Sequence, residues 1–337
     1  MHLLEVKHLH TFFRTKKGIV KAVNDVSYTL DEGKTIGIVG ESGSGKSVSA
    51  MSILQLLDGN GYIDSGEILL EGKDLTKYTL KEMYSVRGND ISVIFQEPMT
   101  SLNPVFSIDR QLSEPFMIHQ GMNKKQAHDE AIKMLQDVQI PNPDVVIKQY
   151  PHQLSGGMRQ RVMIAMALAC KPKILIADEP TTALDVTIQA QILKLMNELK
   201  ATKGTAIIFI THDLGVINEM ADDVAVMYCG QVVEHAPARV IFGHNTMSHP
   251  YTEGLMRSIP RLDTKEERLD PIPGVVPHPL ALPKGCKFAP RCKYCTQKCI
   301  DEEPQLIEVS DTQKIRCFYP KKEERTSAEH KEITVNY

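Results

Sequence analysis

Short apolar runs along this chain predict the strands of a sheet. Four of them are almost continuously apolar, which is typical of buried strands; they cover residues 35–39, 91–95, 174–178 and 206–210. Residues 1–34 instead alternate between apolar and polar positions, which predicts antiparallel strands. Helical spacing of apolar residues appears in 126–136 and 186–200. The pattern predicts an α/β protein with a mostly parallel core sheet, an N-terminal antiparallel β subdomain and a helical insertion.

The composition bounds the class of protein. A length of 337 residues corresponds to roughly two domains. The 39 basic and 42 acidic residues nearly balance, which argues against a nucleic-acid partner. No run of about 18 apolar residues is present, and the first ten residues lack a signal-peptide pattern. We therefore expect a chain that stays in the cytoplasm.

Residues 40–47 read Gly-Glu-Ser-Gly-Ser-Gly-Lys-Ser, the pattern of a phosphate-binding loop. A β-rich run precedes the loop and residues of helical composition, 48–57, follow it, which is the context that distinguishes it from a chance glycine-rich turn. Glycines let successive backbone N–H groups converge on an anion. We expect Lys46 to reach the β- and γ-phosphates and Ser47 to ligate Mg²⁺.

Two further segments indicate phosphate chemistry. Ser155-Gly156-Gly157 opens a helix that we expect to continue to Cys170, so it is either a second anion site or an ordinary helix start. Gln96 directly follows the strand 91–95. A glutamine there could ligate a metal or water beside a phosphate, or could be a loop residue.

Acidic and histidine side chains follow the two central strands. Asp178 and Glu179 come at the end of the strand 174–178, and His212 follows the strand 206–210. The carboxyl ends of parallel strands form the edge where nucleotides bind. We expect Asp178 to hold Mg²⁺ through water, Glu179 to polarise the attacking water and His212 to contact the γ-phosphate.

The end of the chain changes in character. From about residue 250 it is rich in proline, and five of the seven cysteines lie between Cys286 and Cys317. In a reducing compartment such a cluster indicates a metal site rather than disulfides. We expect Cys170 and Cys229 to be buried core residues.

Taken in order, these motifs resemble those of an ABC transporter ATP-binding subunit. The phosphate loop, Gln96, residues 154–160, Asp178-Glu179, residues 183–185 and His212 correspond to the Walker A, Q-loop, signature, Walker B, D-loop and H-loop motifs. Residues 94–104, 150–154, 183–191 and 249–252 resemble the dipeptide/oligopeptide importer branch, which also includes nickel importers. An aromatic residue that stacks on adenine is missing near Lys17; Phe12 or Phe13 could take its place or be core residues.

The resemblance implies a head-to-tail dimer with two ATP molecules at its interface. The expected ATP contacts within one subunit are Gly40, Ser42, Gly43, Ser44, Gly45, Lys46, Ser47 and Val48. Those to the partner's ATP are Ser155, Gly156 and Gly157, with Asp185 at the dimer interface. Ser47, Gln96 and Asp178 would hold Mg²⁺. The catalytic residues would be Glu179 as general base, His212 as γ-phosphate sensor and Gln96 as the link from Mg²⁺ to the helical insertion.

The resemblance also implies a C-terminal metal site. Cys286, Cys292, Cys299 and Cys317 are similar to the cysteines that hold a [4Fe–4S] cluster in some members of the branch. Zinc is the alternative for four thiolates, and four free thiols are the alternative without a metal. Cys295 is an additional cysteine that could replace a ligand.

These expectations define a peripheral ATPase on the cytoplasmic face of the cell membrane. Its partners would be two permease subunits, a related second ATPase rather than a second copy, and an extracytoplasmic substrate-binding protein. The expected domains are an ABC nucleotide-binding domain (1–248) with a helical subdomain (about 98–165), an extension with the metal site (249–320) and a flexible tail (321–337).

The expected function is ATP hydrolysis that drives import of di- or oligopeptides. Import of nickel or another small solute by the same machinery is the alternative. A soluble ABC ATPase is less consistent, because those usually have two cassettes or a coiled-coil insertion. A phosphate-loop switch or kinase of another family would not need the Ser155-Gly156-Gly157 element.

Overall fold

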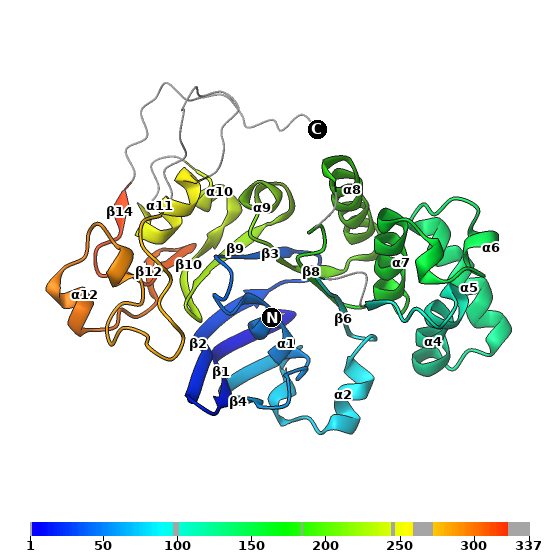
Figure 1. The fold of residues 1–337 in the computed structure, drawn as a ribbon, viewed down its shortest axis with the longest axis horizontal. Helices are drawn as coiled ribbons and strands as arrows, with labels where there is room; N and C mark the ends of the chain where they lie inside the picture. The colour runs from blue at the N-terminus through cyan, green and yellow to red at the C-terminus, as the bar shows by residue number, and fades with distance from the viewer. Residues whose placement is uncertain (1, 97–100, 183–184, 244–246, 259–271, 323–337) are drawn as a thin grey trace. The chain divides into compact units, whose positions relative to one another are not determined.

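Residues 2–96, 101–182, 185–243, 247–258 and 272–322 are described by a computed structural model (Figure 1). The chain forms two compact units. The first unit contains the described residues of 1–30, 35–76 and 211–322, and the second unit contains 31–34 and the described residues of 77–210. Within these ranges, no helix combines the length and the apolar character needed to cross a membrane.

An antiparallel sheet forms the N-terminal part of the first unit. Its strand order is β2-β1-β4-β5, with the bounds β1 Leu4–Thr15, β2 Gly18–Leu30, β4 Gly61–Leu70 and β5 Lys73–Asp74. Alternate residues of β1 and β2, such as Leu4, Val26 and Leu30, are buried, because successive side chains of a strand point to opposite faces. The predicted antiparallel subdomain is confirmed.

Five more strands of the first unit are ordered β12-β13-β10-β9-β3. Strand β3 runs parallel to β9, and β10 is antiparallel to both β9 and β13. The bounds are β3 Thr35–Val39, β9 Asp223–Tyr228, β10 Gln231–Pro237, β12 Ile307–Ser310 and β13 Gln313–Ile315. The proline-rich end of the chain therefore adds two strands to this part of the sheet.

Short helices and turns complete the first unit. They are α1 Lys46–Ile53, α9 Leu214–Met220, α10 Ala238–Ile241, α11 Pro250–Arg257, α12 Gln297–Asp301 and the 3-10 turn η3 Ala289–Arg291. Strand β11 Met247–Ser248 pairs with β14 Lys321–Lys322. The 3-10 turn η1 Leu75–Lys77 leads along the chain into the second unit.

Three parallel strands form the core of the second unit in the order β8-β7-β6. They are β6 Ile91–Ile94, β7 Ile174–Asp178 and β8 Ala206–Ile210. Every residue of β7 and β8 is buried, as expected for parallel strands whose sequence is almost continuously apolar.

Helices α4, α5 and α7 pack on one another in the second unit (Figure 1). The helices and the 3-10 turn are α2 Leu80–Val86, α4 Ile108–Gln120, α5 Lys124–Asp137, α6 Pro143–Val146, η2 Pro151–Gln153, α7 Gly156–Leu168 and α8 Val186–Lys203. Pro115 lies inside α4. Burial of Leu112 and Phe116 on either side of it offsets the one lost backbone hydrogen bond.

Candidate functional site

Contacts with neighbouring backbone require glycine at two positions of the phosphate loop. Gly40 and Gly45 have φ values of +153° and +96°, which other residues rarely adopt. A Cβ atom would overlap the carbonyl oxygen of Met227 at Gly40 and that of Ala22 at Gly45. The strands β9 and β2 therefore press against the loop so closely that only glycine fits.

Lys46 and Ser44 of the loop are buried. The Lys46 ammonium donates to the carbonyl oxygens of Gly40 at 2.8 Å and Glu41 at 3.1 Å. Ser44 Oγ has no hydrogen-bond partner among the described residues, although a buried hydroxyl usually has one. A buried cation and an unsatisfied hydroxyl in one loop fit a bound phosphate. Ser42 and Gly43 of the same loop are exposed, whereas Gly45, Ser47 and Val48 are half-buried.

His212 is exposed and lies in the same unit as the phosphate loop. The preceding Thr211 N–H donates to the carbonyl oxygen of Ile38 at 3.3 Å. Ile38 belongs to β3, which leads into the loop. Asp213 caps α9 by accepting from the N–H groups of Gly215 and Val216. The structure thus holds His212 next to a residue that is hydrogen-bonded to the strand leading into the loop, and its contact with a γ-phosphate stays a prediction.

Glu179 is the centre of a cluster in the second unit. Its Oε2 atom accepts from Gln96 Nε2 at 3.0 Å and from Thr182 Oγ1 at 3.0 Å. Its backbone has a φ of +47°, a conformation that costs free energy in a non-glycine residue and often marks functional sites. The buried Asp178 precedes it in β7. The Gln96 side chain thus contacts Glu179, and its predicted role at Mg²⁺ stays a prediction. Thr182 is a contact that the sequence reasoning missed.

The signature segment and the D-loop residue lie at helix starts of the second unit. Ser155 Oγ accepts from the Met158 N–H at 3.3 Å and caps α7, and Asp185 Oδ1 accepts from the Ile188 N–H at 2.9 Å and caps α8. Both caps are exposed, as is Gly156, and Gly157 is half-buried. A Cβ atom on Gly157 would lie 3.2 Å from Ile188, so this position packs against α8. The D-loop residues 183 and 184 lie outside the described residues.

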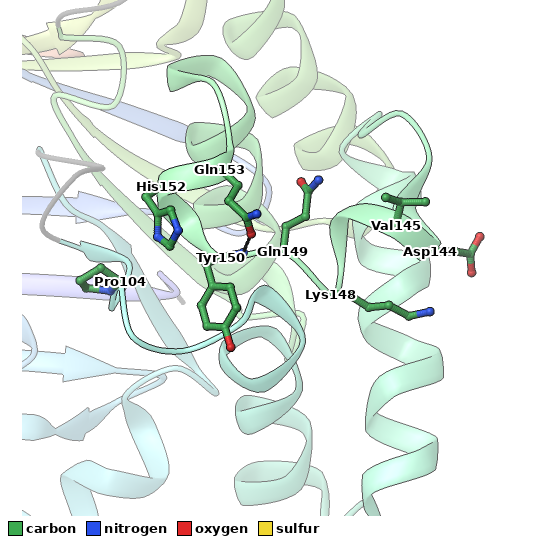
Figure 2. A pocket seen from close by; sticks show the side chains of 8 residues that line it. All are labelled: Pro104, Asp144, Val145, Lys148, Gln149, Tyr150, His152 and Gln153. Atoms are coloured by element: carbon green, nitrogen blue, oxygen red, sulfur yellow. Dashed lines mark hydrogen bonds between the residues drawn. The ribbon is translucent and has the colours of Figure 1, made fainter.

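A surface hollow of about 740 Å³ adjoins the signature in sequence (Figure 2). Tyr150 and His152 stack with ring centroids 5.8 Å apart, and Gln153 Oε1 accepts from the Tyr150 N–H at 2.8 Å. Exposed apolar surface comes from Val145 and Tyr150. The other lining residues are Pro104, Asp144, Lys148 and Gln149. The sequence reasoning used residues 150–154 only as a family marker and missed this hollow.

Of the two aromatic candidates near the N-terminus, Phe12 is buried at 8% exposure. Its ring packs edge-on against His10 and Tyr62. Phe13 is half-buried, and its ring lies close to Gly61. Phe12 is therefore a core residue, the second of the two roles that the sequence allowed.

The fold and these motifs define an α/β phosphate-loop ATPase of the ABC class. The sequence matches the ABC transporter family over residues 23–182 and the oligopeptide/dipeptide transporter C-terminal region over residues 233–299. A dimeric bacterial ABC transporter cassette has a TM-score of 0.63 and 26% identity, covering 70% of this chain and 99% of its own. A second structure of the same cassette, in a dimeric post-hydrolysis state bound to ADP and Pi, gives the same values.

Two relatives match over more than nine-tenths of both chains. The oligopeptide transport ATP-binding protein AppD of Bacillus subtilis is 52% identical over 94% of this chain and 96% of its own. The dipeptide transport ATP-binding protein DppD of Escherichia coli is 47% identical over 95% and 97%. The chain belongs to the ABC transporter family, in its branch of oligopeptide and dipeptide transport ATP-binding proteins.

The predicted C-terminal metal site is corrected by these findings. Cys286, Cys292, Cys299 and Cys317 line one small pocket, here called the cysteine pocket, together with residues that include His249 and Phe288. Among the described residues, no group of three or more His, Cys, Asp or Glu side chains is arranged to hold a metal ion. The names of the relatives given above mention no cluster either. The prediction of a [4Fe–4S] cluster, with zinc as its alternative, was wrong.

The surroundings of the thiols favour their protonated form. Burial raises the pKa of Cys286 and of Cys317 to about 11, so in the chain without a metal both thiols are protonated near neutral pH. Cys295 Sγ contacts the carbonyl oxygen of Thr296. Outside this pocket, Cys229 is buried as predicted, whereas Cys170 is only half-buried.

Proposed function

We propose that this chain hydrolyses ATP to energise the import of di- or oligopeptides. The observation that carries the proposal is the Glu179 carboxylate held by Gln96 and Thr182 at the end of β7. A carboxylate held in one orientation is suited to act as a general base on water. The relatives named for oligopeptide and dipeptide transport support peptides as the cargo.

The proposed ATP contacts within the subunit are those of the phosphate loop. They comprise Gly40, Ser42, Gly43, Ser44, Gly45, Lys46, Ser47 and Val48. Lys46 would donate to phosphate oxygens, and His212 would contact the γ-phosphate. Ser47, Gln96 and Asp178 are the proposed Mg²⁺ ligands, since hydroxyl, amide and carboxylate oxygens suit this ion. When bound, Mg²⁺ supplies positive charge that neutralises the phosphates.

We also propose that Ser155, Gly156 and Gly157 contact the ATP held by a second ATPase subunit. The exposure of Ser155 and Gly156 at the start of α7 supports this role, because a partner's phosphate can then approach the helix N-terminus. Asp185 would lie at the same interface. The dimeric structures of a related cassette support such an arrangement. As the branch implies, the second ATPase would be a related chain rather than a second copy.

The hollow beside Tyr150 is the proposed contact surface for a permease. Its exposed Val145 and Tyr150 (Figure 2) offer apolar area, which favours protein partners when it is rimmed by polar groups. Lys148 and Asp144 supply that rim. Two permease subunits and an extracytoplasmic binding protein would complete the importer, with this chain at the cytoplasmic face of the membrane.

The proposed division of the chain follows the motifs. Residues 1–248 form the nucleotide-binding domain, with a helical subdomain over about 98–165. Residues 249–320 form a segment that we call the C-terminal extension, and residues 321–337 form a tail.

Uptake and ATPase measurements with two variants test the proposal. Lys46→Ala should weaken ATP binding, because it removes a charge at the phosphates. Glu179→Gln should lower ATP turnover by at least about 100-fold while sparing ATP binding, because the water loses its base. Cells whose only copy carries either variant should lose uptake of labelled dipeptides or longer peptides, and an unchanged ATPase rate for Glu179→Gln would contradict the role of Glu179.

The same uptake assay distinguishes the cargo. Nickel is offered beside the peptides to cells with the wild-type chain and with Lys46→Ala. Loss of peptide entry alone supports the proposal, and loss of nickel entry alone would reassign the cargo to a metal ion. Continued uptake of every solute by the variant cells would contradict a role in transport.

A further inference from the structure

The C-terminal extension contacts the phosphate loop at Glu41. Arg291 of η3 binds both carboxylate oxygens of Glu41, with Nη1–Oε2 at 2.7 Å and Nη2–Oε1 at 3.1 Å. Tyr251 of α11 accepts a hydrogen bond from the Glu41 N–H at 2.8 Å. Both partners lie at least 210 residues further along the chain, and all three residues belong to the first unit.

Both C-terminal partners are buried and held in place. Tyr251 is fully buried and Arg291 is 8% exposed. Arg291 Nε also donates to the carbonyl oxygen of Pro273 at 2.9 Å, which fixes the plane of the guanidinium group. The rings of Tyr228, Tyr251 and Phe288 pack beside it with centroids 4.7 to 5.5 Å apart. Two-pronged pairs of this kind are geometrically specific as well as strong.

Glu41 in turn contacts the lysine of the loop. Its carbonyl oxygen accepts from Lys46 Nζ at 3.1 Å, next to the Gly40 carbonyl oxygen at 2.8 Å. Glu41 is thus held by Tyr251 at its N–H, by Arg291 at its side chain and by Lys46 at its carbonyl group. A rotation of this residue would move the acceptor of the lysine that is expected to meet the phosphates.

We propose that Arg291 and Tyr251 are positioning residues for the phosphate loop. They hold Glu41 in the orientation that places Lys46 for a triphosphate, so the C-terminal extension forms part of the nucleotide site. This inference rests on the proposed function, because it assumes that ATP binds at residues 40–48. The loop is preorganised by these contacts, and less binding free energy is spent on ordering it.

A double-mutant cycle on the full chain tests whether Arg291 and Glu41 act together on ATP binding. The variants are Arg291→Met, Glu41→Gln and the two combined, and the measurements are the Kd for ATP by calorimetry and the KM and kcat of hydrolysis. Each single change should weaken ATP binding by about tenfold, a usual size for coupled sites, with a smaller change in kcat. The double variant should be no weaker than the single ones, because both remove the same contact.

Two conservative variants still test the proposal if Arg291→Met folds poorly. Arg291→Lys retains the charge but loses the two-pronged geometry, so it should recover part of the lost affinity. Tyr251→Phe removes only the hydroxyl that accepts from Glu41, and it should raise the Kd for ATP a few-fold. Wild-type ATP affinity in both conservative variants would overturn the proposal.

Arg316 provides the matched control. It is also buried, at 3% exposure, and it pairs with Asp25 through Nη2–Oδ2 at 2.8 Å and with the carbonyl oxygen of Val232 through Nε at 3.0 Å. Arg316→Met should lower the thermal midpoint of unfolding without changing the Kd for ATP. An equal loss of ATP affinity in Arg316→Met and Arg291→Met would overturn the proposal, because general loosening would then explain both.

Lys46→Ala separates failure of this inference from failure of the proposed function. If Lys46→Ala weakens ATP binding while Arg291→Met and Glu41→Gln leave it unchanged, the nucleotide site stands and the positioning role is overturned. If Lys46→Ala itself leaves ATP binding unchanged, the nucleotide site is misplaced and both proposals fail together. Weaker binding in all three variants, with the cycle coupled as expected, supports both.

Discussion

The phosphate loop and the cysteine pocket belong to the same unit but differ in polarity. The loop brings together the buried ammonium of Lys46, the unsatisfied hydroxyl of Ser44 and glycines in backbone conformations that other residues rarely adopt. The pocket surrounds its thiols with side chains such as Phe288, Tyr294 and Phe318. Charge is stabilised in the first environment and penalised in the second, because burial favours the neutral form of a thiol.

The difference shows why a pattern of residue types predicts a site less well than a pattern that reflects the shape of the backbone. Glycines of the loop are required by contacts with Met227 and Ala22, so the sequence pattern reports a geometry. The spacing of the C-terminal cysteines reports only that sulfur atoms are present in this part of the chain. Their ionisation depends on which rings and carboxylates surround them, and these come from distant parts of the chain.

The largest effect is expected from breaking the loop itself. In Gly40→Ala the new methyl group would overlap the Met227 carbonyl oxygen, so the loop must shift away from β9. We expect the Kd for ATP to rise by at least about 100-fold, which corresponds to about 3 kcal/mol. Calorimetry with ATP measures this change.

Gly59→Ala is the control for a glycine substitution in the same unit. No atom lies within 4 Å of a Cβ built there, and no positive φ has to be kept. It should bind ATP like the wild type. Normal ATP affinity in Gly40→Ala would contradict a site whose shape depends on the glycine backbone.

Three of the four buried strands were predictable to the residue, because their signal is local, whereas β6 ends one residue before the predicted 91–95. β3, β7 and β8 have the bounds that the apolar runs predicted. The helix after the phosphate loop is shorter than predicted and ends at Ile53. Gln55 has a φ of +50°, and such a left-handed residue cannot continue a helix. Composition alone carries no sign of that turn.

Contacts between distant parts of the chain were not predictable. Nothing at positions 41 and 291 indicates that they pair across 250 residues, since Glu and Arg occur on most surfaces. Glu179 and Gln96 were predicted as site residues from the order of motifs, but the hydrogen bond between them and the part of Thr182 required the structure. Local patterns thus predict elements, and the fold decides which side chains meet.

The next prediction tests the protonated state of the pocket. With a pKa of about 11, Cys286 and Cys317 have a thiolate fraction of about 0.001 at pH 8, against roughly a quarter for an ordinary thiol. Because the thiolate is the nucleophile, alkylation by iodoacetamide should be roughly 200-fold slower in the native chain than in urea. Peptide mass spectrometry over time measures the rate at each cysteine.

The urea-unfolded chain is the internal control, since the same cysteines then have ordinary pKa values. The native rates should also keep rising as the pH is increased from 8 toward 10. Native alkylation as fast as that in urea would contradict the raised pKa of the two cysteines. The cysteine pocket and the phosphate loop would then differ less in how they treat charge.

The smallest effect concerns Glu234, a buried carboxyl group in the surroundings of the pocket. It is 1% exposed and accepts from the His249 N–H at 2.8 Å and from Gln313 Nε2 at 2.7 Å. Burial, partly opposed by these hydrogen bonds, raises its pKa from 4.5 to about 7. The native state therefore binds its proton more tightly than the unfolded state does, and the stability that this provides is present below about pH 4.5 and lost as the pH rises to about 7.

Glu234→Gln isolates this contribution, because glutamine is neutral throughout and the other ionisable groups remain in both chains. The free energy of unfolding of the wild type, minus that of the variant, should fall by about 2 kcal/mol between pH 5 and pH 7.5. Urea titrations of both chains at four pH values measure the difference. His235 and His249 have pKa values lowered to about 4 and about 3 by burial, but they contribute equally to both curves. If the unfolding free energies of the two chains change with pH in parallel, Glu234 ionises as readily in the native chain as in the unfolded one. The cost of placing a charge beside the cysteine pocket would then be much smaller than the contrast with the phosphate loop requires.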